Sequence, residues 1–182
     1  MLDFENYPVI AAVKSKEDFY KALDSEVQTV FLLSSNIINI DEFVKAAHLK
    51  EKLIFVHMDF VDGLSKDAEG VKYLATKNID GIISTRSNII ATAHDCGISS
   101  IQRFFMIDSR SVDTAVESLQ QSRADMAELM PGVASKAIKT MRARTRVPLI
   151  AGGLIDEKTE IIAALSAGAS AISTGNVALW DQ

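Results

Sequence analysis

Short runs of apolar residues, many of them β-branched, alternate along the chain with longer stretches whose apolar positions recur every three or four residues. The short runs are typical of buried strands, and the longer stretches are typical of amphipathic helices. Successive strand-like runs start about 19 to 28 residues apart. The eight predicted strands are residues 8–13, 29–33, 53–58, 81–84, 100–107, 125–129, 148–151 and 169–174.

Helical patterns follow the predicted strands, and several begin at residues that favour a helix N-terminus. These residues are Ser15, Asp41, Ser65, Ser87, Ser111 and Asp156. Strands that alternate with helices pair in parallel through right-handed crossovers. Eight such units predict an α/β fold, a compact (βα)8 TIM-type barrel, as a single domain over residues 1–182. An open doubly wound sheet is the alternative, and the even spacing of the units favours the barrel.

The chain has little room for an eighth helix, because only residues 175–182 follow the last predicted strand. We therefore expect a truncated last helix that leaves the outer faces of the first and last strands partly uncovered. Exposed apolar barrel wall is unfavourable. We expect a second subunit of a homodimer, or Trp180 and Phe4 folding back, to cover it.

Composition indicates an ordinary globular protein, with 48% hydrophobic and 24% charged residues. No apolar run reaches the roughly 18 residues that cross a membrane, and the acidic N-terminus is unlike a signal peptide. We therefore expect a cytoplasmic protein with no membrane partner. The histidines lie far apart and Cys96 is the single cysteine, so neither a metal site nor a disulfide is predicted. No nucleotide-binding or nucleophile motif is present, and no cofactor is predicted.

Glycines end the seventh and eighth predicted strands, where a barrel of this type commonly binds phosphate. Gly152 and Gly153 end the seventh strand, and Thr174, Gly175 and Asn176 end the eighth. Glycine lets the backbone approach an anion, and free N–H groups can donate to it. The Thr174 hydroxyl and the Asn176 side chain are expected to add hydrogen bonds. The sequence thus predicts a phosphate site, the alternative being two tight turns that need glycine.

Polar side chains also end or interrupt other strands, at the edge where barrel function collects. His57 and Asp59 lie two residues apart and are expected to share a face. Either Gln102 or Arg103 must face the barrel interior, and a buried Arg103 needs a carboxylate such as Asp59 or Glu128. The further candidate ligand contacts are Lys14 and Arg86.

Each of these candidates also has a simpler interpretation. His57 would be a hydrogen-bonded core histidine, and Asp59 would begin a turn with Asp62 and Gly63. Lys14 and Arg86 would be solvated loop charges. Glu128 interrupts an apolar strand, which favours a functional role.

Five segments resemble the glycerol uptake operon antiterminator regulatory proteins. The segments are residues 57–64, 81–86, 102–109, 128–132 and 151–155, within a resemblance that runs from about Pro8 to Trp180. The resemblance implies a bacterial cytoplasmic regulator without catalytic residues that responds to glycerol 3-phosphate. It further implies action on the leader of glycerol-operon messenger RNA, so that transcription passes a terminator.

The ligand implied by the resemblance suits the residues at the strand ends. Its phosphate would lie at the glycine-bearing ends, and its hydroxyls would contact Asp59, Glu128 and Arg103. RNA is less expected, because the net charge is −5 and nucleic-acid binders are usually basic. Between Glu128 and Asp156, however, there is no acid. We predict that one helix face within this stretch contacts RNA, through Lys136, Lys139, Arg142 and Arg146. The alternative is that these residues form an ordinary solvated surface.

Two other functions stay open. The same mouth could belong to an enzyme acting on a phosphorylated triose or sugar, because His57, Asp59 and Glu128 can do acid–base work. The barrel fold supports many chemistries and does not decide between them. The protein could instead be a partner-binding module with a vestigial pocket.

Overall fold

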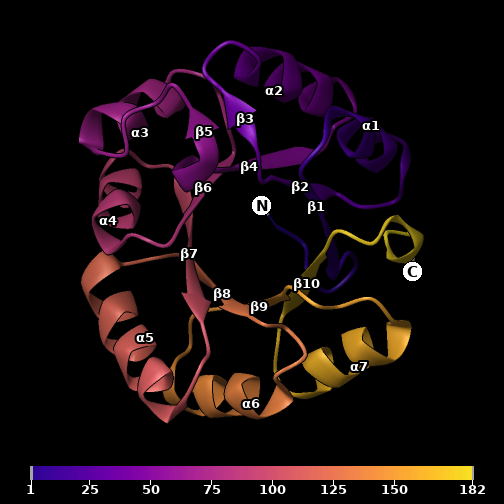
Figure 1. Ribbon diagram of the computed structural model, residues 1–182, viewed down its shortest axis with the longest axis vertical. Coiled ribbons are helices and arrows are strands. Elements are labelled where there is room, and N and C mark those ends of the chain that lie inside the picture. The colour runs from indigo at the N-terminus through magenta and orange to yellow at the C-terminus, as the bar shows by residue number, and fades with distance from the viewer. Residues whose placement is uncertain (1, 182) are drawn as a thin grey trace.

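Across the described residues, 2–181, eight parallel strands close into a barrel in a computed structural model (Figure 1). The strand order around the barrel is β1-β10-β9-β8-β7-β6-β4-β2. The (βα)8 prediction is therefore confirmed, and the open-sheet alternative is wrong. The barrel strands are β1 (Val9–Val13), β2 (Thr29–Leu32), β4 (Leu53–His57), β6 (Gly81–Ser84), β7 (Ser99–Phe105), β8 (Met126–Met130), β9 (Leu149–Gly152) and β10 (Ala171–Thr174).

Helices form a ring outside the barrel (Figure 1). They are α1 (Lys16–Asp24), α2 (Ile40–Leu49), α3 (Ala68–Ala75), α4 (Ser87–Asp95), α5 (Ser109–Ser122), α6 (Ser135–Arg144) and α7 (Lys158–Ser166). Ser15 caps α1 as predicted, by accepting the N–H of Asp18. The predicted start of α5 is wrong, because Asp108 accepts the N–H of Ser111 in a capping box. In the described part of the chain, no helix has the length and apolar character needed to span a bilayer.

One layer of the barrel interior is filled by an apolar side chain from each strand. These side chains are Ile10, Phe31, Phe55, Ile83, Ile101, Met126, Ile150 and Ala171. Leu2 and Phe4 pack against this inner cluster, so the N-terminal segment closes the barrel at the amino ends of the strands. Phe4 therefore does not cover the outer wall, and the expectation is wrong for this residue.

Trp180 covers the wall that a full eighth helix would have covered. A short 3-10 helix, η2 (Val177–Leu179), follows β10 and lies against α1. The buried Trp180 joins the apolar cluster between barrel and helices, and its Nε1 donates to the Thr174 carbonyl at 2.9 Å. The prediction that Trp180 folds back is confirmed. The uncovered wall from which we expected a homodimer is accordingly closed within one chain.

A small parallel sheet, absent from the predictions, stands at the carboxyl ends of β2 and β4. It pairs β3 (Ser35–Asn36) with β5 (Val61–Asp62), and β5 follows the 3-10 helix η1 (Met58–Phe60). Strands of two residues are too short to give a periodic signal in the sequence.

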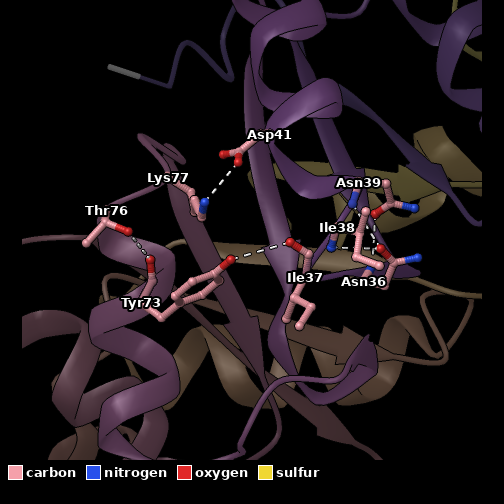
Figure 2. Close-up of polar contacts among 8 residues, drawn as sticks. All are labelled: Asn36, Ile37, Ile38, Asn39, Asp41, Tyr73, Thr76 and Lys77. Atoms are coloured by element: carbon pink, nitrogen blue, oxygen red, sulfur yellow. Dashed lines mark hydrogen bonds and ion pairs between the residues drawn. The ribbon is translucent and has the colours of Figure 1, made fainter.

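The turn after β3 is held by hydrogen bonds to its own side chains (Figure 2). Asn36 Oδ1 accepts the N–H groups of Ile38 and Asn39, and Asn39 Oδ1 accepts the N–H of Asn36. The Tyr73 hydroxyl of α3 donates to the Ile37 carbonyl at 3.4 Å. This turn therefore presents the apolar side chain of Ile38 to solvent at the rim.

Candidate ligand-binding site

A pocket of about 650 Å³ opens at the carboxyl ends of the barrel strands. This is the end where barrels of this type place their functional residues, and the volume suits a small molecule. The pocket is lined by Ala12, Lys14, Leu33, Ser34, Phe60, Arg103, Phe105, Glu128, Met130, Gly153, Leu154, Ser173 and Gly175. Its lining is apolar around a small number of polar groups, as in most small-molecule sites.

A buried ion pair forms the polar part of the pocket. Arg103 Nε lies 2.6 Å from Glu128 Oε2, and Ser173 Oγ donates to Glu128 Oε1 at 2.6 Å. Of the alternatives that the sequence left open, Arg103 rather than Gln102 lines the pocket, and its partner is Glu128 rather than Asp59. Within residues 2–181, no protein acceptor engages the terminal guanidinium nitrogens of Arg103. Those nitrogens are therefore available to an anion or a hydroxyl in the pocket.

His57 is buried, with 1% of its surface exposed, and it is not hydrogen-bonded. Neither ring nitrogen has a partner among the described residues, so the alternative of a hydrogen-bonded core histidine is wrong. Burial and the nearby Arg103 guanidinium lower the pKa of His57 to about 4, and Asp59 opposes them weakly. Phe60 packs on the imidazole, with ring centroids 4.8 Å apart, and separates it from the pocket.

Asp59 faces the end of β6 rather than the pocket. Its carboxylate accepts hydrogen bonds from the Ser84 hydroxyl, and from the N–H and hydroxyl of Thr85, at 2.8 to 2.9 Å. Burial raises the pKa of Asp59, but these hydrogen bonds outweigh burial and leave it below its usual value. Arg86 Nε lies 3.8 Å from Asp59 and its side chain is exposed. The predicted His57–Asp59 pair on one strand face is wrong, because β4 ends at His57 and Asp59 lies in η1.

The turn after β9 borders the pocket with a glycine in a left-handed conformation. Gly153 has φ +78° and Leu154 has φ +59°, so two consecutive residues depart from ordinary strand geometry. Among the described residues, none accepts a hydrogen bond from the Leu154 N–H. Gly152 serves a different need, since a Cβ there would stand 2.4 Å from Ser173 Oγ. Gly152 thus makes room for the Glu128–Ser173 contact and does not line the pocket.

The turn after β10 is braced by two of the predicted ligand contacts. Thr174 Oγ1 donates to the Ile155 carbonyl at 2.7 Å and accepts the N–H of Asn176 at 3.0 Å. The Asn176 side chain accepts the N–H of Ala178 and donates to the Asp156 carbonyl. The structure corrects both predictions, because neither side chain lines the pocket. Gly175 does line it.

Sequence reasoning missed several pocket residues. Ser173 follows Ala171 on the inward face of β10, which places Thr174 on the outer face. Phe60 and Phe105 line the pocket as exposed aromatic side chains. The sequence signal for Ser173 was the alternation of β10, but Ser173 and Thr174 are both small hydroxyl residues and either register was plausible. Lys14 lines the pocket as predicted.

The basic stretch of the chain is divided between two ends of the barrel. Lys136 stands in the first turn of α6 at the mouth, and α6 ends at Arg144. Arg146 therefore lies in a loop and not on the helix face with Lys139, so that expectation is wrong. The Arg142 guanidinium donates to the Thr145 and Val147 carbonyls. Its charge is thus used within the fold.

The described residues contain no metal-binding cluster. No group of three or more His, Cys, Asp or Glu side chains there could hold a metal ion. The site therefore consists of the Arg103–Glu128 ion pair, the buried imidazole of His57, two turns that contain glycine, and an apolar wall.

Residues 9–180 match the profile of a family described as glycerol-3-phosphate responsive antiterminator. The chain belongs to this family. A glycerol uptake operon antiterminator regulatory protein from Listeria monocytogenes is 34% identical, covers 98% of this chain and 97% of its own, and superposes with a TM-score of 0.93. A glycerol uptake operon antiterminator-related protein from Thermotoga maritima is 32% identical. It covers 97% of this chain and 99% of its own, and superposes with a TM-score of 0.86.

Other relatives add less about function. The Escherichia coli protein YgcP is 36% identical over 174 residues, which are 95% of this chain and 91% of its own. An aldolase with 15% identity superposes with a TM-score of 0.76. Identity that low shows a common barrel fold and nothing about chemistry. The family membership thus assigns the chain to a regulatory family.

Proposed function

We propose that this protein is a transcription antiterminator that binds glycerol 3-phosphate at the barrel mouth. In this proposal it acts in the cytoplasm on the leader RNA of genes for glycerol uptake and metabolism. Family membership supports both the ligand and the regulatory role. One observation carries the ligand assignment. Arg103, whose Nε pairs with Glu128, lines the same pocket as Gly153 and Leu154 of the turn after β9.

The two ends of the ligand would find different partners. The phosphate would accept hydrogen bonds from the N–H of Leu154 and from the backbone near Gly153 and Gly175. Arg103 would add a charge-assisted hydrogen bond. The ligand hydroxyls would contact polar groups that line the pocket beside Arg103, among them Glu128. No metal or cofactor is needed for this arrangement.

The state of the acid–base groups supports binding rather than catalysis. Both Glu128 oxygens accept hydrogen bonds from Arg103 and Ser173. Asp59 accepts three hydrogen bonds from the end of β6. His57 lies beneath Phe60 and does not line the pocket. A general base must reach the proton that it removes, and these carboxylates are already committed to neighbours.

The alternatives make different predictions for the same titration. A barrel enzyme acting on a phosphorylated triose or sugar would bind its substrate and convert it. A partner-binding module with a vestigial pocket would bind no phosphorylated triose. We expect calorimetry to detect glycerol 3-phosphate binding, with glycerol and inorganic phosphate each binding far more weakly. Phosphorus NMR of the equilibrated mixture should show the ligand unchanged, and its conversion would favour the enzyme.

The pocket assignment is tested with Arg103→Met against Lys139→Met as a control. Both changes remove one cation, but Lys139 is exposed on α6. We expect Arg103→Met to weaken glycerol 3-phosphate binding by tenfold or more, about 1.4 kcal/mol, and the control to leave it unchanged. Because Arg103→Met leaves the Glu128 carboxylate buried, the double change Arg103→Met and Glu128→Met is measured as well. Wild-type affinity in these folded variants would contradict the site.

The regulatory part is tested with the leader RNA of a glycerol operon. We expect the protein to bind this RNA and glycerol 3-phosphate to change the affinity. By linkage, the RNA must change the affinity for the ligand by the same factor. A protein that binds the ligand without binding the RNA would contradict the antiterminator role.

A further inference from the structure

Three consecutive helices begin at the barrel mouth without an acidic residue in their first turns. These helices are α4, α5 and α6, and they are neighbours around the barrel (Figure 1). Helices α1, α2, α3 and α7 each carry an acid in the first turn, as the positive end of a helix dipole favours. One side of the mouth is therefore different in charge from the other.

Each of these three helices begins with a cation. Arg86 is the N-cap residue of α4, Arg110 is the second residue of α5, and Lys136 is the second residue of α6. All three are exposed. A cation in a first turn is disfavoured by the helix dipole, so these residues do not stabilise the helices that carry them.

The three cations are poorly neutralised by their surroundings. Neither Arg110 nor Lys136 forms an ion pair with another residue in the described chain. Arg86 has only Asp59, at 3.8 Å, and that carboxylate already accepts three hydrogen bonds. Asp108 is the N-cap residue of α5, and its carboxylate accepts the N–H of Ser111. Three cations stand here against two carboxylates, Asp59 and Asp108, so this sector carries a positive charge in a protein of net charge −5.

Exposed apolar side chains lie on the same side of the mouth. Phe105 ends β7 with 55% of its surface exposed, and Ile107 follows with 86% exposed. Both precede α5 directly, and Phe105 also lines the ligand pocket. We call Arg86, Phe105, Ile107, Arg110 and Lys136 together the basic rim. Large apolar groups in a charged surface mark an interaction site.

We infer that the basic rim is the surface that binds single-stranded RNA, an inference that rests on the proposed antiterminator function. Proteins that bind single strands combine cations along the phosphate backbone with aromatic side chains on which bases stack. The rim supplies the cations at three helix starts and an aromatic face at Phe105. A second copy of the chain is a poorer occupant, because a two-fold contact through this rim would oppose like charges.

This location connects the RNA with the ligand. Phe105 belongs to both the pocket and the rim, and Arg103 lies two residues earlier on the same strand. A ligand that engages Arg103 therefore acts on the element that carries the stacking aromatic. The rim also replaces the α6 face as the RNA surface, since only Lys136 of the basic stretch lies at the mouth.

Two matched double variants test the inference. Arg110→Gln with Lys136→Gln removes two rim cations that do not line the pocket, and Lys139→Gln with Arg146→Gln removes two exposed cations elsewhere. Binding of a 5′-labelled leader RNA is followed by fluorescence anisotropy across a salt series. We expect the rim variant to lose affinity on the order of tenfold and its salt slope to fall by about 1.4, at 0.7 per lost phosphate contact. Glycerol 3-phosphate binding should persist in both variants.

A third variant, Phe105→Leu, keeps an apolar side chain and removes the stacking surface. We expect RNA affinity to fall by about fivefold or more, from the loss of one stacked base. Wild-type affinity in the rim double variant, or an equal loss in the Lys139/Arg146 variant, overturns the inference while the antiterminator function stands. A wild-type protein that binds no leader RNA overturns both. Self-association that the rim variant alone abolishes, without RNA binding, would assign the rim to a second copy.

Discussion

Arg103 on β7 and Glu128 on β8 stand directly opposite each other in the barrel and form a buried ion pair. Their side chains are 9% and 1% exposed, and Nε lies 2.6 Å from Oε2. The pair neutralises both charges inside the barrel but leaves the outer end of the guanidinium to the pocket. The residue most suited to hold an anion is therefore positioned by a carboxylate that lines the same pocket.

Removing the Glu128 carboxylate should lower the free energy of unfolding far more than removing the Ser173 hydroxyl that donates to it. Glu128→Ala leaves the Arg103 charge buried without a counter-charge, and we expect a loss of about 3–5 kcal/mol in the free energy of unfolding. Ser173→Ala removes one hydrogen bond to the same carboxylate and should cost about 1 kcal/mol. Urea unfolding of the two variants measures the difference. Equal losses would show that the ion pair does not stabilise the barrel.

This pair also shows how far the sequence could be interpreted. Strand alternation required either Gln102 or Arg103 to face inward, and the cost of a lone buried charge required a carboxylate. Eight evenly spaced units similarly predicted the barrel, because its topology follows from alternating elements. Alternation could not choose between Asp59 and Glu128. That choice depends on the strand register, which pairs Arg103 with Glu128.

Other site predictions failed where regular strand geometry ends. Asp59 was placed by alternation, but β4 stops at His57 and the 3-10 turn directs Asp59 towards β6. Thr174 and Asn176 were expected to meet the ligand, and instead they brace the turn after β10. Turn conformation depends on hydrogen bonds between segments distant in sequence, such as Thr174 to Ile155, and no local pattern encodes them.

Gly153 should matter for ligand affinity beyond its backbone strain. Gly153→Ala places a side chain at φ +78° beside Met130 Cε, at the edge of the pocket. Gly97→Ala imposes similar strain at φ +71° with no atom within 4 Å, so it is a matched control. We expect both variants to lose about 1–2 kcal/mol of stability, from the left-handed conformation. Calorimetry should show weaker glycerol 3-phosphate binding only in Gly153→Ala, and equal affinities would remove the turn from the site.

His57 should make the protein less stable as the pH falls from 6.5 to 4. Its pKa is 6.5 in the unfolded chain and about 4 in the folded one, so the unfolded chain binds more protons in this window. The loss should approach about 3 kcal/mol by pH 4. His57→Asn should flatten the dependence of urea midpoints on pH. The Asp59 contribution is lost only below its usual pKa of 3.8, outside this window. An unchanged slope in His57→Asn would assign the effect to other groups.

Arg142 and Lys139 lie on the same helix, yet their replacement should have different consequences. The Arg142 guanidinium donates to the carbonyls of Thr145 and Val147, which belong to the loop between α6 and β9. Its stem packs on Gly168, since a Cβ there would stand 2.8 Å from Arg142 Cγ. Lys139 is exposed and forms no ion pair within residues 2–181.

We therefore expect Arg142→Gln to lower the free energy of unfolding by about 1–3 kcal/mol, because the loop carbonyls lose charged donors and the stem loses packing. Lys139→Gln should change it by less than about 0.5 kcal/mol, as for other exposed positions. Urea unfolding measures both. If Arg142→Gln were as stable as Lys139→Gln, its guanidinium would be free for other partners. If the expected loss of stability is found, weaker RNA binding by a variant that includes Arg142→Gln would reflect a damaged fold. Only the matched double variants, which leave Arg142 unchanged, would then locate the RNA surface.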